Sequence, residues 1–561
     1  MNKRTILTIA LTMAIAASAM ASQPLRRTVS RQTTDGRTVL VERRGGPDFS
    51  WWQTADGLCF TMGRDARLAP VTTDIPTIRR AMNASTENGL GSFGTSGMGV
   101  VRSLGTPRIP VIMVAFSDKD FLPANDKEKV TRFLNEEGYK DERYAVGSVK
   151  DYFRHSSYGH FVPHFEVVAK VTLPNDYKYY GAHSGSATDA RRMEAVREAV
   201  RLAEEQGVDF STFATDGHAP LVSILHAGPG EQEDYGSDYG DYLWAHFSQS
   251  TVVARSATID SYLMTNETMR DFDSAGNLTN EYMTGIGTFC HEFSHALGLP
   301  DMYDVDGSSG GTGQTPGFWD VMDYQFMYDG FRPMEYSAYE RSMMGWIEVE
   351  DLTDDKVEHQ FDIDPLQTSD ATDADVMRHV AYRIVNPQDP NEYFIMENRR
   401  KNTFYQQKIL GEGMLLWHIA YDSGRWASNR VNVTGSKQHV RVVPADGQWQ
   451  SVKDANNTDA DGKRYTFTGD LFPGYAAVTR FDRSLDDFFT GQLTDVLTEI
   501  TLGTDGRVSF VFGEQKTVGI DSPVAESHDS SAASSAYDLQ GRPVNANAPG
   551  FYILDGKKII K

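Results

Sequence analysis

The segment from His291 to Asp301, with the sequence HEFSHALGLPD, constrains the fold of this chain more than any other part of it. Residues four apart lie on one face of an α-helix, about one turn from each other, so the imidazoles of His291 and His295 can reach a single metal ion. Zinc–nitrogen bonds are about 2.0–2.1 Å long, which requires both rings to face the same point. The segment therefore predicts a helix that presents two metal ligands.

Glu292 and Asp301 give this segment the composition of a catalytic metal site. Glu292 is rotated from the first ligand by about 100° on a helix, so its carboxylate can accept a proton from metal-bound water. Asp301 can return to the ion as a third ligand, and Asp304 is the nearest substitute. Two histidines and one carboxylate leave one position of a zinc ion open, as catalysis requires.

Gly298 and Pro300 predict where the helix ends. Glycine tolerates the left-handed conformation that follows a helix, and proline prevents the helix from resuming. A surface helix that carries two histidines and an acid by chance is the alternative interpretation. The glycine three residues after His295 and the aspartate six residues after it favour the metal site.

Composition excludes several other classes of protein. The chain has 561 residues, of which 40% are hydrophobic, which is enough for a large core and for more than one domain. The 54 Lys and Arg against 77 Asp and Glu give a net charge of −23, which disfavours nucleic acid as a partner. Two cysteines rule out a disulfide-dense scaffold or a four-thiolate zinc site.

The N-terminus carries the three parts of a secretory signal peptide. Lys3 and Arg4 supply positive charge, 6–17 is an apolar run, and small residues surround Ala19 and Ala21. We therefore expect residues 1–21 to be removed on export, and the protein to be secreted or held at the cell surface. Since no later stretch reaches about 18 apolar residues, we expect no transmembrane segment after cleavage.

The remaining chain divides by composition into five parts. Residues 22–104 contain short strands and a Gly/Ser-rich linker, typical of a propeptide-like region. Residues 105–350 mix strands with helices, which predicts an α+β domain. Residues 351–515 contain strands separated by Gly and Asp turns, which predicts an all-β, sandwich-like domain. Residues 516–535 form a linker, and 536–561 form a short C-terminal module.

Four long elements are predicted in the α+β region. The apolar runs 109–116 and 220–226 are typical of buried strands. The charged, alanine-rich segment 191–206 predicts a helix that ends at a glycine. The segment 282–299, which contains both histidines, predicts another helix.

Motifs well beyond this helix resemble the immune inhibitor A family of secreted bacterial metallopeptidases, which are zinc endopeptidases of the metzincin type. The segment HEFSHALGLPDMYD at 291–304 carries the strongest likeness, and the resemblance covers about residues 105–515. The further motifs that agree in order are 111–118, 148–153, 157–159, 226–228, 319–322, 344–346, 396–399, 416–419 and 469–473.

The resemblance implies a metzincin-like catalytic domain, with a mixed sheet and an active-site helix, that holds one catalytic Zn²⁺. It also implies a methionine turn below the metal, for which Met322 is the candidate. A thioether there forms an apolar floor without binding zinc. Tyr324, two residues later, occupies a position at which some metzincins place a tyrosine that supports the oxyanion, and a phenol can hydrogen-bond such a charge.

Three weaker signals accompany the motif. Asp304 and Asp306 lie in an oxygen-rich, glycine-containing stretch and are candidate ligands for a structural Ca²⁺. Cys59 has three interpretations: a thiolate that latches the zinc from the propeptide, a partner for Cys290, or a buried thiol. Residues 537–561 resemble the C-terminal sorting modules of secreted Bacteroidetes proteins, which implies surface attachment; a small terminal hairpin is the alternative.

The combined prediction is a secreted zinc-dependent endopeptidase, made as a precursor, that hydrolyses proteins or peptides. Zinc is bound by His291, His295 and Asp301, and Glu292 is the general base. An alternative from a different class is a surface adhesin, or protein-binding protein, whose metallopeptidase domain is inactive. The presence of Glu292 argues against it, because an inactive site has no need of the base. A metal-dependent amidase that acts on small substrates is a third hypothesis.

Overall fold

The structure is a computed structural model in which two compact units are distinguished, Met1–Glu514 and Gln515–Lys561. It describes residues 19–21, 28–46, 49–55, 58–62, 67–70, 99–141, 147–183, 188–234, 236, 238–305, 315–323, 330–352, 359–365, 380–402, 405, 409, 411–433, 438–448, 467, 469–514, 536–537, 543–544, 551–554 and 557–560.

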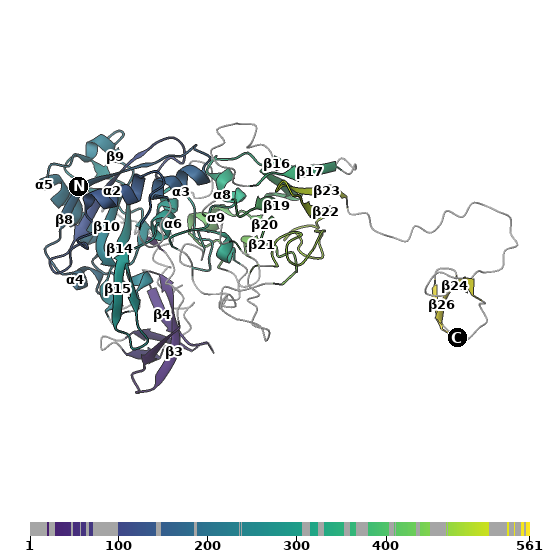
Figure 1. The fold of residues 1–561 in the computed structure, drawn as a ribbon, viewed down its shortest axis with the longest axis horizontal. Helices are drawn as coiled ribbons and strands as arrows, with labels where there is room; N and C mark the ends of the chain where they lie inside the picture. The colour runs from purple at the N-terminus through teal and green to yellow at the C-terminus, as the bar shows by residue number, and fades with distance from the viewer. Residues whose placement is uncertain are drawn as a thin grey trace, which may run out of the picture. The chain divides into compact units, whose positions relative to one another are not determined.

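The largest sheet among the described residues has seven strands and is mixed; its strands β8, β10, β14 and β15 are labelled in Figure 1. Its order is β1-β11-β14-β10-β7-β8, with β15 pairing with β14. The strands β8, β7, β10 and β14 are parallel, whereas β11, β1 and β15 are antiparallel to their neighbours. The bounds are β1 Ala19–Ala21, β7 Arg108–Ala115, β8 His164–Thr172, β10 Val222–Pro229, β11 His246–Ser248, β14 Tyr262–Phe272 and β15 Leu278–Met283.

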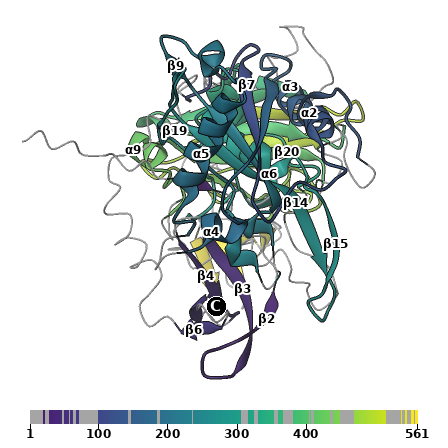
Figure 2. The same cartoon turned by 90° about the vertical axis from the view of Figure 1, so that its left-hand side faces the viewer.

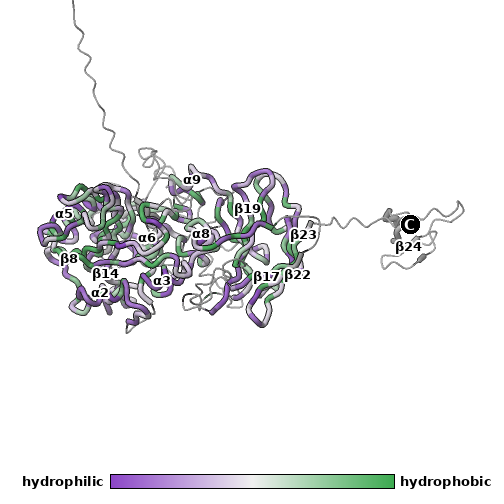
Figure 3. The backbone as a smooth tube through the Cα atoms, turned by 90° about the horizontal axis from the view of Figure 1, so that it is seen from above, coloured by the Kyte–Doolittle hydropathy of each residue, from purple (hydrophilic) through white to green (hydrophobic). Residues whose placement is uncertain are grey.

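The two central strands are buried on both faces of the sheet. All residues of β10 and all but the first of β7 are buried, as continuous apolar runs require. Along β7, Val111 and Met113 join one hydrophobic core, while Ile112 and Val114 join another, because side chains alternate between faces. Figure 3, coloured by hydropathy, shows green hydrophobic stretches among the elements of this unit. The strands predicted at 109–116 and 220–226 are therefore confirmed, with ends shifted by a few residues.

Helices cover both faces of this sheet. Helix α5 packs its alanine and valine side chains into one core, and it lies toward the viewer in Figure 2. Helices α2, α3, α6 and α8 contribute to the other core. The bounds are α2 Lys127–Asn135, α3 Val149–Ser156, α4 Tyr177–Gly181, α5 Arg192–Glu205, α6 Gly287–Ala296 and α8 Ala338–Met343.

Helix α6 is shorter than the sequence predicts. The expected helix covered 282–299, but Tyr282 and Met283 pair with Met269 and Thr268 in the β14–β15 hairpin. The aromatic and apolar residues there suit either element, and the antiparallel pairing decides for a strand. The helix predicted at 191–206 agrees with α5 within one residue at each end.

Among the described residues 350–514, the regular elements are strands, apart from the short helix α9. One sheet has the order β16-β18-β19-β20-β21 and a second has the order β17-β23-β22. Ile363, Tyr382, Phe394 and Phe510, which come from both sheets, share one hydrophobic core. The bounds are β16 Glu350–Asp351, β17 His359–Ile363, β18 Ala381–Asn386, β19 Asp389–Arg399, β20 Gly413–Ala420, α9 Ser423–Ala427, β21 Val440–Val442, β22 Asp495–Leu502 and β23 Val508–Glu514. The sandwich-like architecture stays a prediction.

The main core crosses the predicted domain boundary at residue 350. Trp417 and Trp426, from the β-rich region, belong to the same hydrophobic core as Phe293 of α6 and Trp319. The indole Nε1 of Trp426 also donates to the Tyr339 hydroxyl over 2.8 Å. The two predicted domains therefore share packing within the first compact unit.

Three smaller sheets complete the described chain. A five-stranded sheet has the order β2-β3-β4-β5-β6, and another joins β12, β13 and β9. The second compact unit contains a sheet of the order β25-β24-β26-β27. The bounds are β2 Val29–Gln32, β3 Thr38–Gly46, β4 Phe49–Gln53, β5 Cys59–Met62, β6 Leu68–Pro70, β9 His218–Ala219, β12 Val252–Val253, β13 Thr258–Ile259, β24 Ala536–Tyr537, β25 Pro543–Val544, β26 Phe551–Leu554 and β27 Lys557–Ile560. Among the described residues, we find no helix with the length and apolar character that crossing a membrane requires.

Candidate metal centre

Helix α6 ends where the sequence predicts a reversal of the chain. Gly298 has φ +105°, a left-handed conformation that suits glycine, which confirms the predicted role of this residue. The backbone N–H of Leu299 donates to the Ser294 carbonyl, and that of Met302 donates to the Met322 carbonyl. These bonds lead the chain back toward the helix, so that Asp301 lies beside it.

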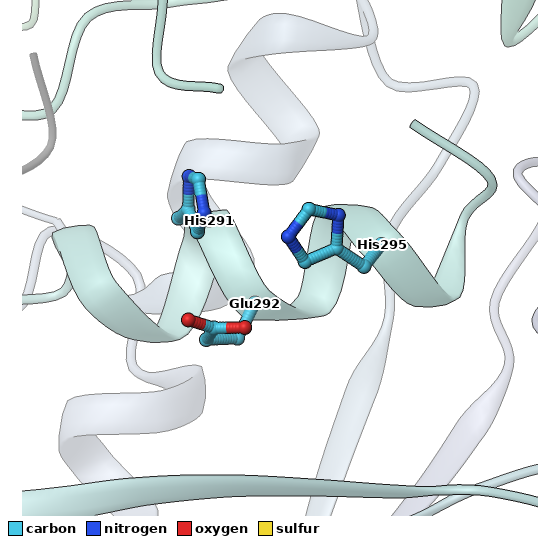
Figure 4. Close-up of side chains that lie close together, drawn as sticks. All are labelled: His291, Glu292 and His295. Atoms are coloured by element: carbon cyan, nitrogen blue, oxygen red, sulfur yellow. The ribbon is translucent and has the colours of Figure 1, made fainter. Parts of the chain in front are cut away.

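The structure brings three predicted ligands together. The Nε2 atoms of His291 and His295 lie 3.1 Å and 3.4 Å from one oxygen, Oδ1, of Asp301. All three side chains are almost wholly buried. Figure 4 shows the two imidazoles about one turn apart on α6, with the Glu292 carboxylate beside them. The i, i+4 spacing therefore places both rings as the sequence predicts.

Backbone carbonyls orient both rings. His291 Nδ1 lies 2.9 Å from the Val321 carbonyl oxygen, and His295 Nδ1 lies 2.7 Å from that of Leu299. Because a carbonyl oxygen only accepts, each Nδ1 must carry a proton and donate it. In a neutral ring the lone pair is then on Nε2, the atom that faces Asp301. Such bonds to the second ring nitrogen are typical of histidines that bind metals.

The spacing of these atoms fits a zinc ion. Ligand atoms 2.0–2.1 Å from a tetrahedral zinc are about 3.3–3.4 Å from each other. The two measured separations, 3.1 Å and 3.4 Å, lie close to this value. Two nitrogen lone pairs that face a carboxylate oxygen repel it unless protons or a cation lie between them. The donor set of two imidazoles and one carboxylate is also one that zinc accepts in catalytic sites.

Asn429 fixes the third predicted ligand, Asp301. Its side-chain Nδ2 donates to Asp301 Oδ2 over 2.6 Å, and its Oδ1 accepts from the Asp301 backbone N–H over 2.7 Å. Burial raises the pKa of Asp301, but His295 and His291, when their Nε2 atoms are protonated, lower it by more, so the net pKa is well below the ordinary value. Asp301 is therefore an anion, with one oxygen held by Asn429 and the other directed to the histidines.

Glu292 is close enough to act at the same centre. Its carboxylate is fully buried, and one of its oxygens lies within 4.8 Å of the ligand atoms of His291 and His295. Asp301 Oδ1 lies 3.1 Å and 3.4 Å from the two Nε2 atoms, and these shorter distances suit a third ligand. Glu292, with its neighbouring position on the helix, is then available for proton transfer.

Met322 lies in a turn next to His291. It is fully buried, and its backbone N–H donates to Asp320 Oδ1 over 2.7 Å. The preceding residue, Val321, supplies the carbonyl that orients His291. The turn thus supports the site through its backbone, and the Met322 side chain belongs to the same hydrophobic core as Phe293 of α6. Tyr324 and Asp306 lie outside the described residues, and no observation supports the predicted calcium ion.

A buried acid supports the same turn from the β-rich region. The Trp319 indole Nε1 donates to Asp470 Oδ2 over 2.6 Å. Burial raises the pKa of Asp470 from 3.8 to about 7, although the bond from Trp319 opposes this rise. The folded state therefore binds the Asp470 proton more strongly than the unfolded state. This contribution to stability is complete below about pH 4 and is lost as the pH rises through 7.

Comparison with known proteins agrees with this geometry. Residues 109–348 match the family model described as "Immune inhibitor A peptidase M6, catalytic domain". The chain carries an immune inhibitor A-type metallopeptidase domain. The matched segment contains α6, the Met322 turn and Asp301, but it ends before Asn429.

Two curated relatives of this domain show the extent of the likeness. Immune inhibitor A of Bacillus thuringiensis subsp. alesti is 28% identical over 210 residues, which cover 33% of this chain and 30% of the relative. The pre-pro-metalloprotease PrtV of Vibrio cholerae serotype O1 is 23% identical over 279 residues, which cover 43% of this chain and 27% of the relative. The chain thus spans less than a third of the length of either relative.

Sequence reasoning found the residues of the motif but missed their supports. His291, Glu292, His295 and Asp301 are brought together in the immune inhibitor A-type domain. Asn429 was missed because it is 128 residues from Asp301 along the chain, and no local pattern links the two. Cys290, which was considered as a partner for Cys59, is a buried thiol on α6, and these two described residues do not form a disulfide.

Proposed function

We propose that this chain is a secreted zinc-dependent endopeptidase. The observation that carries the proposal is the convergence of His291 Nε2 and His295 Nε2 on one oxygen of Asp301, with both rings oriented by backbone carbonyls. The metallopeptidase domain match over 109–348 supports it. It also favours a peptidase over an adhesin with an inactive domain.

The residues of the site divide the work of hydrolysis. His291, His295 and Asp301 hold the ion, which supplies a Lewis acid that polarises the peptide carbonyl and lowers the pKa of water toward ~7. Glu292 accepts a proton from the attacking water and then passes it to the leaving amine. The carbonyls of Val321 and Leu299 keep the rings in the tautomer that binds metal.

The remaining assignments extend this proposal along the chain. Residues 1–21 direct export, and residues 22–104 form a propeptide-like region of a precursor. The module at 536–561 attaches the protein to the cell surface. Tyr324 supports the oxyanion, as a phenol near the open side of the ion would. Proteins or peptides are the substrates, by likeness to relatives whose printed names include a metalloprotease.

The test compares the full chain with Glu292→Gln. Each protein is assayed for zinc content and for cleavage of casein, before and after limited trypsin treatment, with and without a chelator. Gln keeps the size of the side chain and loses the base, so we expect zinc content to be unchanged and the cleavage rate to fall about 10²–10⁴-fold.

Two outcomes would reject the proposal. One is a zinc-loaded wild-type chain that cleaves no protein substrate in any of these conditions but still binds one, as an adhesin would. The other is a Glu292→Gln variant that cleaves at the wild-type rate. Cleavage of dipeptide-sized substrates alone would instead indicate an amidase.

A further inference from the structure

A second group of metal-binding side chains lies outside α6. His183, Asp189 and Glu231 each offer one ligand atom, and these atoms all lie within 4.8 Å of one another. His183 follows α4, Asp189 precedes α5, and Glu231 begins the short helix η2 (Glu231–Glu233) after β10. The group shares no residue with the site of His291.

The two carboxylates of this group are fully buried. Asp189 and Glu231 have no exposed surface, and the side chain of His183 is 34% exposed. His183 Nε2 lies 3.0 Å from Glu231 Oε2. The ligand oxygens of Asp189 and Glu231 lie within 4.8 Å of each other. Two carboxylates at such a separation repel each other in an apolar interior unless a proton or a cation lies between them.

One oxygen of Asp189 has no hydrogen-bond partner among the residues that the structure describes. Its Oδ2 accepts from the Trp244 backbone N–H over 2.7 Å, while its Oδ1 is buried without any such partner. Burying a carboxylate oxygen in this way is costly, so such atoms usually mark an ion, a proton or a water. Burial first, and then the neighbouring Glu231, raise the pKa of Asp189 well above its ordinary value.

We propose that His183, Asp189 and Glu231 bind a second divalent cation, and that this cation is zinc. One imidazole nitrogen with carboxylate oxygens is a donor set that suits zinc, whereas calcium takes six to eight oxygens. The positive ion neutralises the two buried carboxylates and satisfies Asp189 Oδ1. The exposed edge of His183 gives the ion a route from solvent.

This cation would hold the segment that leads into β11. Asp189 binds the backbone of Trp244, and the Glu231 backbone N–H donates to the Leu243 carbonyl over 3.1 Å. Strand β11 follows directly, and its Phe247 ring lies 6.3 Å from the His295 ring between centroids. The ion therefore ties three segments of chain together beside the catalytic helix, as a structural metal does.

The test counts zinc ions in purified full-length chains. Wild type should hold two equivalents of zinc by mass spectrometry after dialysis against zinc, and Asp189→Asn and His183→Ala should each hold one. The double variant His291→Ala/His295→Ala should keep one equivalent, so the second site is measured even if the proposed peptidase function is wrong. In this double variant, zinc should raise the unfolding temperature, and adding His183→Ala should abolish the shift.

The matched control is Asp260→Asn. Asp260 also pairs with a histidine, His218, over 2.8 Å, but at the surface. This variant should keep both equivalents, which excludes adventitious binding to any histidine–carboxylate pair. The His183→Ala variant keeps the test valid if Asp189→Asn fails to fold, because His183 is partly exposed and its removal should disturb the fold less. No bound zinc in the His291→Ala/His295→Ala variant, or wild-type zinc content in both His183→Ala and Asp189→Asn, would overturn the proposal and leave a proton shared by the two carboxylates.

Discussion

The contact between Asn429 and Asp301 gives a sharp test of the proposed third ligand. Asn429 makes two hydrogen bonds to Asp301, of 2.6 Å and 2.7 Å, one of them to the carboxylate. We choose Asn429→Gly, because Asn429 has φ +52° and glycine adopts this conformation without strain. The substitution therefore removes the side chain without straining the backbone.

The expected loss follows from these bonds. A hydrogen bond to a charged group contributes about 1.5–3 kcal/mol, which corresponds to roughly 10- to 150-fold in an equilibrium constant. Substitution of a residue that orients a metal ligand typically lowers metal affinity by about 10–100-fold. These two estimates, one from hydrogen-bond energies and one from metal affinities, agree. We therefore expect the zinc dissociation constant to rise by about 10–100-fold in a competition titration against a chelator.

The control for this experiment is Asp216→Gly. Asp216 is exposed and has φ +51°, so the variant makes the same kind of backbone change away from the metal. Its zinc affinity should equal that of wild type. If Asn429→Gly is folded, by circular dichroism, and binds zinc as tightly as Asp216→Gly, Asp301 is not a zinc ligand held by Asn429.

Three further predictions concern the packing around the site. Asp470→Asn should raise the free energy of unfolding relative to wild type. The gain should grow between about pH 4 and 7 to at most about 4 kcal/mol, at 1.36 kcal/mol per pKa unit. Denaturant titrations at several pH values measure this gain, and a gain independent of pH would contradict the prediction. Met322→Leu should lower the free energy of unfolding by less than about 1.5 kcal/mol and leave the zinc content unchanged, because we expect this buried side chain to pack without binding metal. A loss of zinc in this variant would contradict the prediction. A chain ended at residue 350 should resist limited proteolysis far less than one ended at Glu514, because the main core includes Trp417.

The sequence predicted best those features that depend on neighbouring residues. The spacing of His291 and His295 sets their common helix face, and Gly298 adopts the left-handed conformation that ends the helix. The long apolar runs of β7 and β10 also identified buried strands. In each case local stereochemistry and the tertiary structure favour the same conformation.

Features that depend on distant contacts could not be predicted in the same way. The segment at 282–283 has the composition of a helix or a strand, and its pairing with β14 decides which it forms. Asn429 and Asp470 reach the metal-centre region from more than 120 residues away along the chain. His183, Asp189 and Glu231 have no regular spacing, so only the fold brings them together.

The core that spans residue 350 limits how this protein can recombine with its relatives. The matched family segment ends at residue 348, yet Asn429 holds Asp301 and Trp426 bonds to Tyr339 from beyond that point. A chimera joined near 350 would separate an acid of the metal centre from the side chain that orients it. A junction after Glu514, where the compact unit ends, keeps these interacting residues together in the part of the chimera that comes from this protein.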